Sequence, residues 1–171
     1  WFSTFTIDKG SKQGIAKGMN VIAGSGLVGI VTDVGPNYSK VRSIIDDSSN
    51  VSAMVLTTKD NFNVSGSLMN MNKDKVLPFS ELRDENDKVQ QGDPVVTSYV
   101  SDQYQQGLLI GYIYSVEDNA NNLTKSGYIT PVVDFQHLQD VLVITEIKNT
   151  GKEDISSSKT SSTESENSTQ N

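Results

Sequence analysis

Two stretches of this chain share one pattern of glycines and β-branched residues. Residues 92–116 predict a strand, a loop and a second strand, because β-branched and aromatic residues dominate their two apolar runs. Three motifs occur earlier in the same order: Gly18–Ile22 matches Gly92–Val96, Gly26-Leu27 matches Gly107-Leu108, and Gly29–Val34 matches Gly111–Val116. The match indicates two related β units in one chain, with a longer loop in the second copy. Two unrelated hairpins that share common turn residues are the alternative.

The other apolar segments are short and rich in β-forming residues. Turn-forming residues separate them at intervals of about 8–12 residues, which is the spacing of a barrel or a sandwich rather than of alternating strands and helices. No segment carries a sustained helical stripe of apolar residues. The sequence therefore predicts an all-β fold, with strands at 1–7, 20–23, 27–34, 40–45, 51–57, 63–70, 76–79, 93–98, 108–116, 127–133 and 140–147.

A polar stretch, Asn70–Asp74, supplies the expected boundary between the two β units. We expect a first β-barrel unit at residues 1–72 and a second at residues 73–148, and the sequence leaves open whether the units exchange strands. From residue 149 onward polar residues dominate, and Ile155 is the single large apolar residue. Such a segment buries too little apolar area to offset the entropy cost of ordering, so residues 149–171 are expected to be a disordered tail.

Charge and cysteine content exclude several classes of protein. The 14 basic and 21 acidic residues give a net charge of −7, which argues against nucleic acid as a partner because phosphate binding needs a basic face. The chain has no cysteine, which excludes disulfides, thiolate metal sites and a cysteine nucleophile. No apolar run approaches the roughly 20 residues of a membrane-spanning helix. The chain starts at Trp1 in a strand-like run, and we expect any membrane anchor to lie upstream.

Residues suited to catalysis or to metal binding are few. The one histidine, His137, follows every candidate serine of the β region, including Ser98. In a two-barrel serine protease the histidine comes from the first barrel, and Ser98 also lacks the glycine-flanked setting that builds an oxyanion hole. The pairs Asp46-Asp47 and Asp84-Glu85 lie in turn-like segments, where we expect solvated carboxylates rather than metal ligands. We therefore expect no catalytic residue, no cofactor and no metal site.

Tyrosines around the second copy of the repeat are the candidate partner-binding residues. Tyr99 and Tyr104 lie in the loop between its two strands, and Tyr112 and Tyr114 alternate with Ile113 in the second strand. If Ile113 faces the core, Tyr112 and Tyr114 form an outward aromatic pair, and tyrosine is favoured at protein interfaces. The alternative is that these tyrosines cover the barrel or face inward. Exposed strand edges offer a second route, by addition of a strand from a partner or another copy.

An ordered set of motifs over most of residues 5–147 resembles the bacterial rod-shape-determining MreC family. The motifs, in chain order, are Ile7-Asp8-Lys9-Gly10, Gly14-Ile15, Lys17-Gly18-Met19, Gly26–Gly29, Ser39-Lys40-Val41, Ile44–Asp47, Gly66-Ser67-Leu68, Gly92–Ser98, Gly107–Gly111, Val132-Val133-Asp134 and Val141–Ile144. The loop after Ser98 departs from the family pattern: Tyr99 and Ser101-Asp102 stand where the family usually has glycines, and Gln105 stands where it often has proline.

The resemblance implies a pair of small β-barrels, one with trypsin-like topology but no protease activity. It also implies a non-enzymatic scaffold of the cell-elongation machinery on the extracytoplasmic side of the membrane, anchored by an N-terminal helix outside this sequence. The implied partners are a class B penicillin-binding protein and other peptidoglycan synthases, MreD, indirectly MreB, and further copies of the protein. The alternative function is a trypsin-like-fold hydrolase acting on wall or peptide substrates.

Overall fold

The computed structural model describes residues 3–148, and the expected disordered tail at 149–171 lies outside them. Eleven strands, one α-helix and one short 3-10 helix lie in this part of the chain. Their bounds are β1 Thr4–Ile7, η1 Ser11–Gln13, β2 Asn20–Ala23, β3 Gly26–Val34, β4 Ser39–Ser43, β5 Asn50–Val55, β6 Asn61–Ser65, α1 Leu68–Asp74, β7 Leu77–Leu82, β8 Pro94–Thr97, β9 Leu109–Asp118, β10 Lys125–Pro131 and β11 Leu142–Ile144. Within residues 3–148 no helix is long and apolar enough to cross a membrane.

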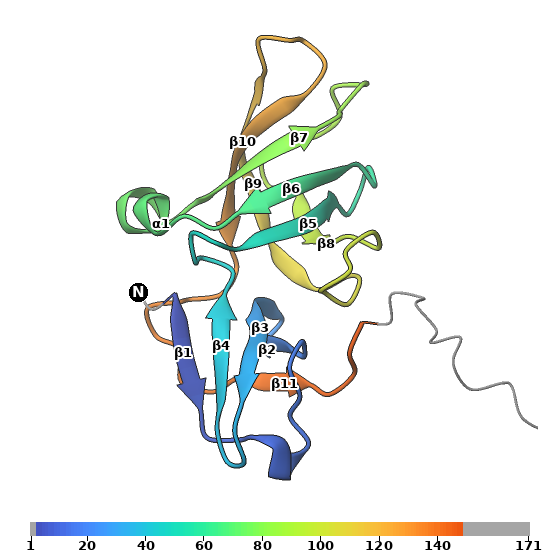
Figure 1. The fold of residues 1–171 in the computed structure, drawn as a ribbon. Coiled ribbons are helices and arrows are strands. Elements are labelled where there is room, and N and C mark those ends of the chain that lie inside the picture. Colours follow the sequence, from blue (N-terminus) through green and yellow to red (C-terminus); the bar gives the residue numbers. More distant parts are fainter. Residues whose placement is uncertain (1–2, 149–171) are drawn as a thin grey trace, which may run out of the picture.

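The strands form two units stacked end to end (Figure 1). In the six-stranded barrel the order is β9-β10-β7-β6-β5-β8, and the pairing of β8 with β9 closes the ring. In the five-stranded unit the order is β1-β4-β3-β2-β11. One parallel bridge, Gly26 with Leu109, joins the two units through β3 and β9. These pairings confirm the predicted all-β fold with barrel-like units.

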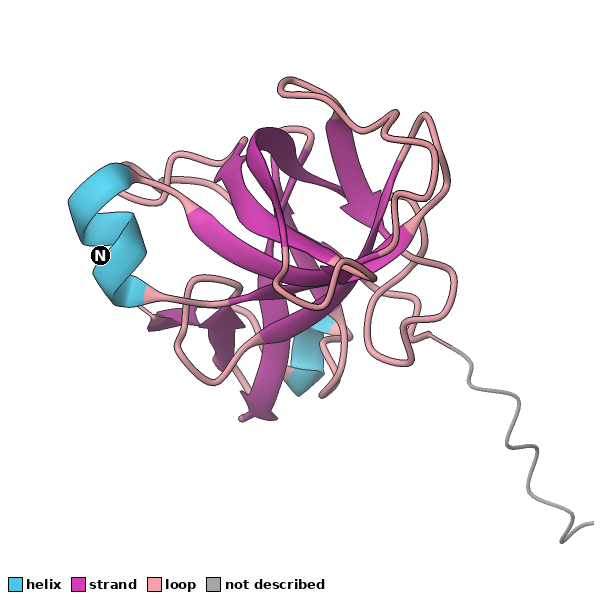
Figure 2. Ribbon diagram, turned by 90° about the horizontal axis from the view of Figure 1, so that it is seen from above, coloured by secondary structure: helices cyan, strands magenta, loops and turns pink. Residues whose placement is uncertain are grey.

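Strand pairing does not follow the expected boundary at residue 72. Strands β5 and β6 precede it, yet they pair with β8 and β7, which follow it. At the other end of the chain, β11 pairs with β2 of the five-stranded unit. The polar stretch taken as a boundary is helix α1, which Ser67 caps by accepting a hydrogen bond from Asn70 N at 3.2 Å. Seen from above, α1 lies at the side of the ring of strands (Figure 2).

The predicted repeat is confirmed by the register of two hairpins. Val21 pairs with Gly29 across β2 and β3, and Val95 pairs with Gly111 across β8 and β9. A β-bulge follows at the same point of both hairpins. The matched glycines that precede the hairpins have nearly the same backbone angle, with φ of 91° at Gly18 and 92° at Gly92.

One detail of the predicted alignment is wrong by one residue. Leu27 pairs with Ile22, and the residue in the equivalent pair with Val96 is Leu109 rather than Leu108. Gly26 and Gly107 were aligned because both precede a leucine, but Gly107 lies four residues before Gly111 whereas Gly26 lies three before Gly29, because the loop of the second copy is longer. A sequence match alone cannot locate such a shift, because both Leu108 and Leu109 suit a strand.

The matched glycines of β3 and β9 allow a close approach of the neighbouring strand. A Cβ atom on Gly29 would lie 2.1 Å from the Arg42 carbonyl oxygen, and one on Gly111 would lie 2.0 Å from the Thr130 carbonyl oxygen. Side-chain atoms cannot occupy such positions unless a strand moves. Glycine at these two positions is therefore required by packing in both copies of the repeat.

We expect Gly29→Ala and Gly111→Ala to lower the free energy of unfolding by similar amounts, about 1–3 kcal/mol each, because both force one strand away from the next. Urea unfolding of the two variants beside the parent chain measures the effect. A large loss in one variant and none in the other would contradict the structural equivalence of the two hairpins.

Candidate partner-binding surface

The outward tyrosine pair on β9 forms as the alternation predicts. Ile113 is 2% exposed and belongs to the core, whereas Tyr112 is 40% and Tyr114 is 53% exposed. The neighbouring strand β10 adds Tyr128, which is 38% exposed and pairs with Ser115. We name Tyr112, Tyr114 and Tyr128 the tyrosine face. Tyr128 was not predicted, although its position next to the buried Ile129 gives the same alternation signal.

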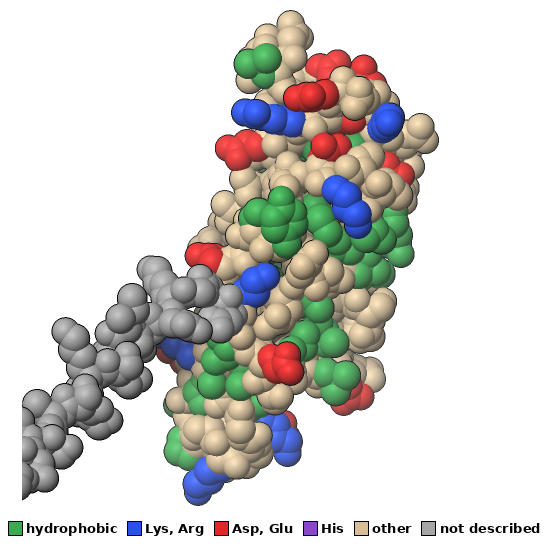
Figure 3. Space-filling model, turned by 90° about the vertical axis from the view of Figure 1, so that its right-hand side faces the viewer, with side chains coloured by type: hydrophobic (Ala, Val, Ile, Leu, Met, Phe, Trp, Pro, Cys, Tyr) green, Lys and Arg blue, Asp and Glu red, His purple; other side chains and the backbone are tan. Residues whose placement is uncertain are grey.

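Exposed apolar side chains are also found elsewhere on the barrel. Tyr99 and Val100 are 57% and 55% exposed, at the start of the loop between β8 and β9. Figure 3 shows hydrophobic side chains gathered in the middle of one face, with acidic side chains concentrated near its upper end. An apolar area with charged residues at its margin is typical of protein-binding surfaces.

The structure places Tyr104 inside the protein, which corrects the prediction that it is available to a partner. Its side chain is 2% exposed, and its loop lies against the five-stranded unit. Burial raises the pKa of Tyr104 to about 12, and the Arg42 guanidinium offsets part of this rise. Tyr104 is therefore a packing residue that connects the two units.

Asn20 of β2 holds the Tyr104 loop in place. Its side-chain nitrogen donates a 2.9 Å hydrogen bond to the Gln103 carbonyl, and its side-chain oxygen accepts a 2.8 Å bond from Gln105 N. Asn20 itself is 1% exposed, so the Asn20 end of both bonds is shielded from water. Sequence reasoning missed this residue, because nothing in the local pattern of β2 distinguishes a buried asparagine from an exposed one.

Ser98 and His137 do not form a catalytic pair. Ser98 is fully buried, and its hydroxyl donates to Asn61 Oδ1 while it accepts a hydrogen bond from Val100 N. His137 lies on the loop after β10 and its Nδ1 is 2.9 Å from Asp134 Oδ2, where both side chains are exposed. The geometry of this part of the chain therefore offers no nucleophile activated by a histidine. Across residues 3–148, no group of three or more His, Asp and Glu side chains is placed to hold a metal ion.

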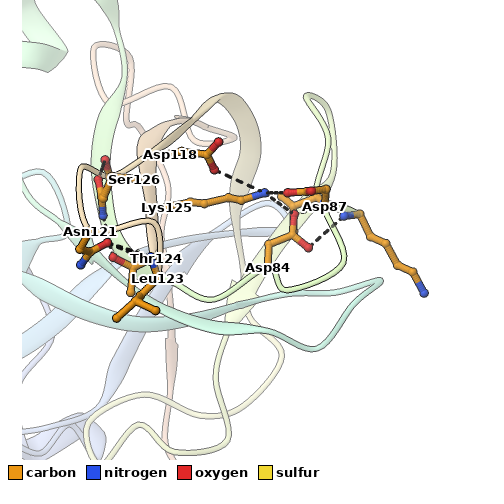
Figure 4. A network of polar contacts seen from close by, with 11 residues as sticks. Asp84, Asp87, Asp118, Asn121, Leu123, Thr124, Lys125 and Ser126 are labelled. Atoms are coloured by element: carbon orange, nitrogen blue, oxygen red, sulfur yellow. Dashed lines mark hydrogen bonds and ion pairs between the residues drawn. The ribbon is translucent and has the colours of Figure 1, made fainter.

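Asp84 is buried rather than solvated, which corrects the expectation for the Asp84-Glu85 pair. Its carboxylate accepts hydrogen bonds of 2.9 Å from Lys88 N and from Val89 N, and Lys125 Nζ lies 3.3 Å away. Lys125 also contacts Asp87, so Lys125 of β10 ties the β9–β10 hairpin to Asp84 and Asp87 of the β7–β8 loop (Figure 4). Burial alone would raise the pKa of Asp84, but the hydrogen bonds from Val89 N, Lys88 N and Lys125 lower it below its ordinary value.

The comparison with family models identifies the chain. Residues 1–145 match the model described as rod shape-determining protein MreC, barrel core. The chain belongs to the MreC family. Two similar members are the cell shape-determining MreC proteins of Bacillus subtilis, 31% identical over 151 residues, and of Listeria monocytogenes, 31% identical over 157 residues. The matches cover 84% and 90% of this chain but 52% of each relative, so the chain spans about half the length of these MreC proteins.

Solved MreC structures share this fold. MreC of Listeria monocytogenes matches with a TM-score of 0.77 and 29% identity, over 88% of this chain and 72% of the other. A complex between penicillin-binding protein PBP2 and MreC from Helicobacter pylori matches with a TM-score of 0.57 and 16% identity, over 72% of this chain and 74% of the other. At that identity the second match shows the MreC fold alone.

Proposed function

We propose that this chain is the extracytoplasmic β portion of a non-enzymatic scaffold that organises peptidoglycan synthases during bacterial cell elongation. The observation that carries the proposal is the tyrosine face, an exposed aromatic surface on a closed barrel. The neighbouring β9 side chains Ile110 and Ile113 are buried, so they belong to the core and fix the outward direction of the tyrosines. Rigid strands present these aromatic rings in a fixed arrangement, and aromatic residues supply much of the binding energy at protein interfaces.

The solved relatives supply the class of partner. MreC from Helicobacter pylori has been solved in a complex with the penicillin-binding protein PBP2. By analogy, this chain binds the extracytoplasmic portion of a class B penicillin-binding protein. Contacts with MreD, an indirect connection to MreB and association between copies complete the proposed assembly, with an N-terminal helix as the anchor. The hydrolase alternative has no supporting geometry, because Ser98 and His137 each interact with other residues.

We expect saturable binding of the purified chain to the extracytoplasmic portion of an elongation-specific class B penicillin-binding protein. In a Tyr112→Ala/Tyr114→Ala variant the dissociation constant should rise at least tenfold, because the aromatic area that the partner covers is removed. Surface plasmon resonance measures both constants, and thermal unfolding checks that the variant is folded.

The matched control is Tyr38→Ala, which removes a tyrosine that is 48% exposed on the turn between β3 and β4 of the five-stranded unit. Its affinity should stay within about twofold of the parent chain, as for a residue outside the interface. The proposal fails if the parent chain shows no saturable binding, or if the double variant binds as tightly as the parent. Tyr104→Ala is unsuitable for this test, because loss of packing rather than of contact would lower its affinity.

A further inference from the structure

The repeat extends beyond the matched hairpins and leaves one strand without a counterpart. Strands β2, β3 and β4 correspond to β8, β9 and β10. In the first copy, Ile44 N just after β4 donates a 2.9 Å hydrogen bond to Val28 O of β3. In the second copy, Val132 N just after β10 donates the equivalent 3.0 Å bond to Ile110 O of β9. β1 pairs with β4 as β7 pairs with β10, and β11 pairs with β2 as β5 pairs with β8. In the six-stranded barrel, β6 lies between β7 and β5 and closes the ring. No described strand takes that place between β1 and β11.

Strand direction shows why the five-stranded unit is incomplete. Every neighbouring pair in the order β1-β4-β3-β2-β11 is antiparallel, so β1 and β11 run in the same direction. An antiparallel ring needs an even number of strands, and these two edges cannot complete one by pairing with each other. A single added strand would be antiparallel to both, as β6 is to β5 and β7.

A groove lies at the position of the missing strand. It has a volume of about 640 Å³ and is lined on one side by residues 5–9 and on the other by residues from 135 to 143. Phe5 and Ile7 of β1 are half-buried there and contact the core, and Phe135 and Leu138 line the opposite side. The groove therefore combines apolar side chains, which suit the interior face of a barrel strand, with polar ones such as Asp8 and Gln136.

Within residues 3–148, no strand pairs with the edge of β1 that faces this groove. Ser43 N donates a 2.8 Å hydrogen bond to Ser3 O. This bond fixes which residues of β1 direct their backbone groups toward β4, because such residues alternate along an antiparallel pair. Under that alternation the amide and carbonyl groups of Thr4 and Thr6 point away from β4, toward the groove. Among residues 3–148, β4 is the single strand that pairs with β1. Such an edge is a template for addition of another strand.

We propose that this groove binds an extended segment of a partner protein, which adds to β1 as the sixth strand of the unit. The segment runs antiparallel to β1 and carries apolar residues at alternate positions, as β6 does with its buried Phe62 and Val64. Asp8 follows the end of β1 and lines the groove together with Lys9 and Asp140, so the lining has a net negative charge. A lysine or arginine at the start of the docked segment complements Asp8.

Residues 149–171 do not supply such a segment. Residues 149–171 contain one large apolar residue, Ile155, and no alternating apolar pattern. In residues 3–148 of a second copy, only β1 and β11 have an unpaired edge, and each has just one, so neither can pair with both sides of the groove. The groove and the tyrosine face also lie on different units, so this inference holds whether or not the tyrosine face binds a synthase.

Selection from a random library of nine-residue peptides against the full 171-residue chain tests the proposal. The enriched peptides should show apolar residues at alternate positions after a basic residue. Synthetic versions should bind at least tenfold more weakly to Ile7→Lys, which places a charge among the inward side chains of the groove. Ser11→Lys adds the same charge on the exposed helix η1 of the same unit, outside the groove, and should retain binding within twofold. Absence of enriched peptides, or equal binding to Ile7→Lys and Ser11→Lys, would overturn the proposal.

Amide hydrogen exchange supplies a readout that does not depend on the Ile7→Lys variant being folded. The amides of Thr4 and Thr6 should exchange rapidly in the free chain and at least tenfold more slowly with a selected peptide bound. Slow exchange in the free chain would mean that a segment of the chain itself covers this edge. That result, or peptide binding without protection of the two amides, would also overturn the proposal.

Discussion

Replacement of Tyr104 by alanine should lower the free energy of unfolding by about 3–5 kcal/mol, the usual cost of removing a large buried aromatic ring. Tyr104 is 2% exposed and connects the β8–β9 loop to the five-stranded unit, so its ring supports the packing of both units. Urea unfolding at neutral pH measures the change.

Two variants separate loss of packing from other effects. Tyr104→Phe keeps the ring, removes only the hydroxyl group, and should cost about 1 kcal/mol or less. Tyr99 lies in the same loop but is 57% exposed. Its replacement in Tyr99→Ala should therefore change the free energy of unfolding by about 0.5 kcal/mol or less. A Tyr104→Ala variant as stable as Tyr99→Ala would show that the loop does not hold the units together.

The contrast between the tyrosines shows what the sequence can predict. The orientation of Tyr112 and Tyr114 follows from a strand period of two once Ile113 is placed in the core, and the structure agrees. The burial of Tyr104 depends on Asn20, which is distant in sequence and reaches the loop only after the two units have packed. The sequence around Tyr104 does not indicate its loop's contact with Asn20.

The same limit applies to the arrangement of strands. Glycine and valine positions predicted both hairpins, because turn geometry and strand packing act over a few residues. They did not predict the partner of the strand that follows each half of the repeat. β5 follows the first half in the chain but pairs with β8 of the second half, and β11 follows the second half but pairs with β2 of the first. Long-range pairing is chosen by the packing of the whole chain, and short apolar strands are compatible with several partners.

Removal of the Asp84 carboxylate should have the second large effect on stability. Asp84→Ala leaves the backbone N–H groups of Lys88 and Val89 without their acceptor and removes the most buried anion around Lys125. Each unsatisfied buried group costs about 1–3 kcal/mol, so we expect a loss of about 2–4 kcal/mol at neutral pH. The control is Glu85→Ala, an exposed neighbour, which should change the unfolding free energy by about 0.5 kcal/mol or less.

The effect of Asp84→Ala should depend on pH in a defined direction. Because hydrogen bonds lower the pKa of Asp84 in the folded chain, its ionised form stabilises the fold fully above the ordinary aspartate pKa of about 4. That stabilisation is lost as the pH falls through the lower folded-state value, where the carboxylate takes up a proton and binds Lys125 less strongly. Urea unfolding at pH 7 and at pH 3 should therefore show a smaller difference between Asp84→Ala and the parent chain at pH 3. An equal difference at both pH values would assign the role of Asp84 to packing rather than to its charge.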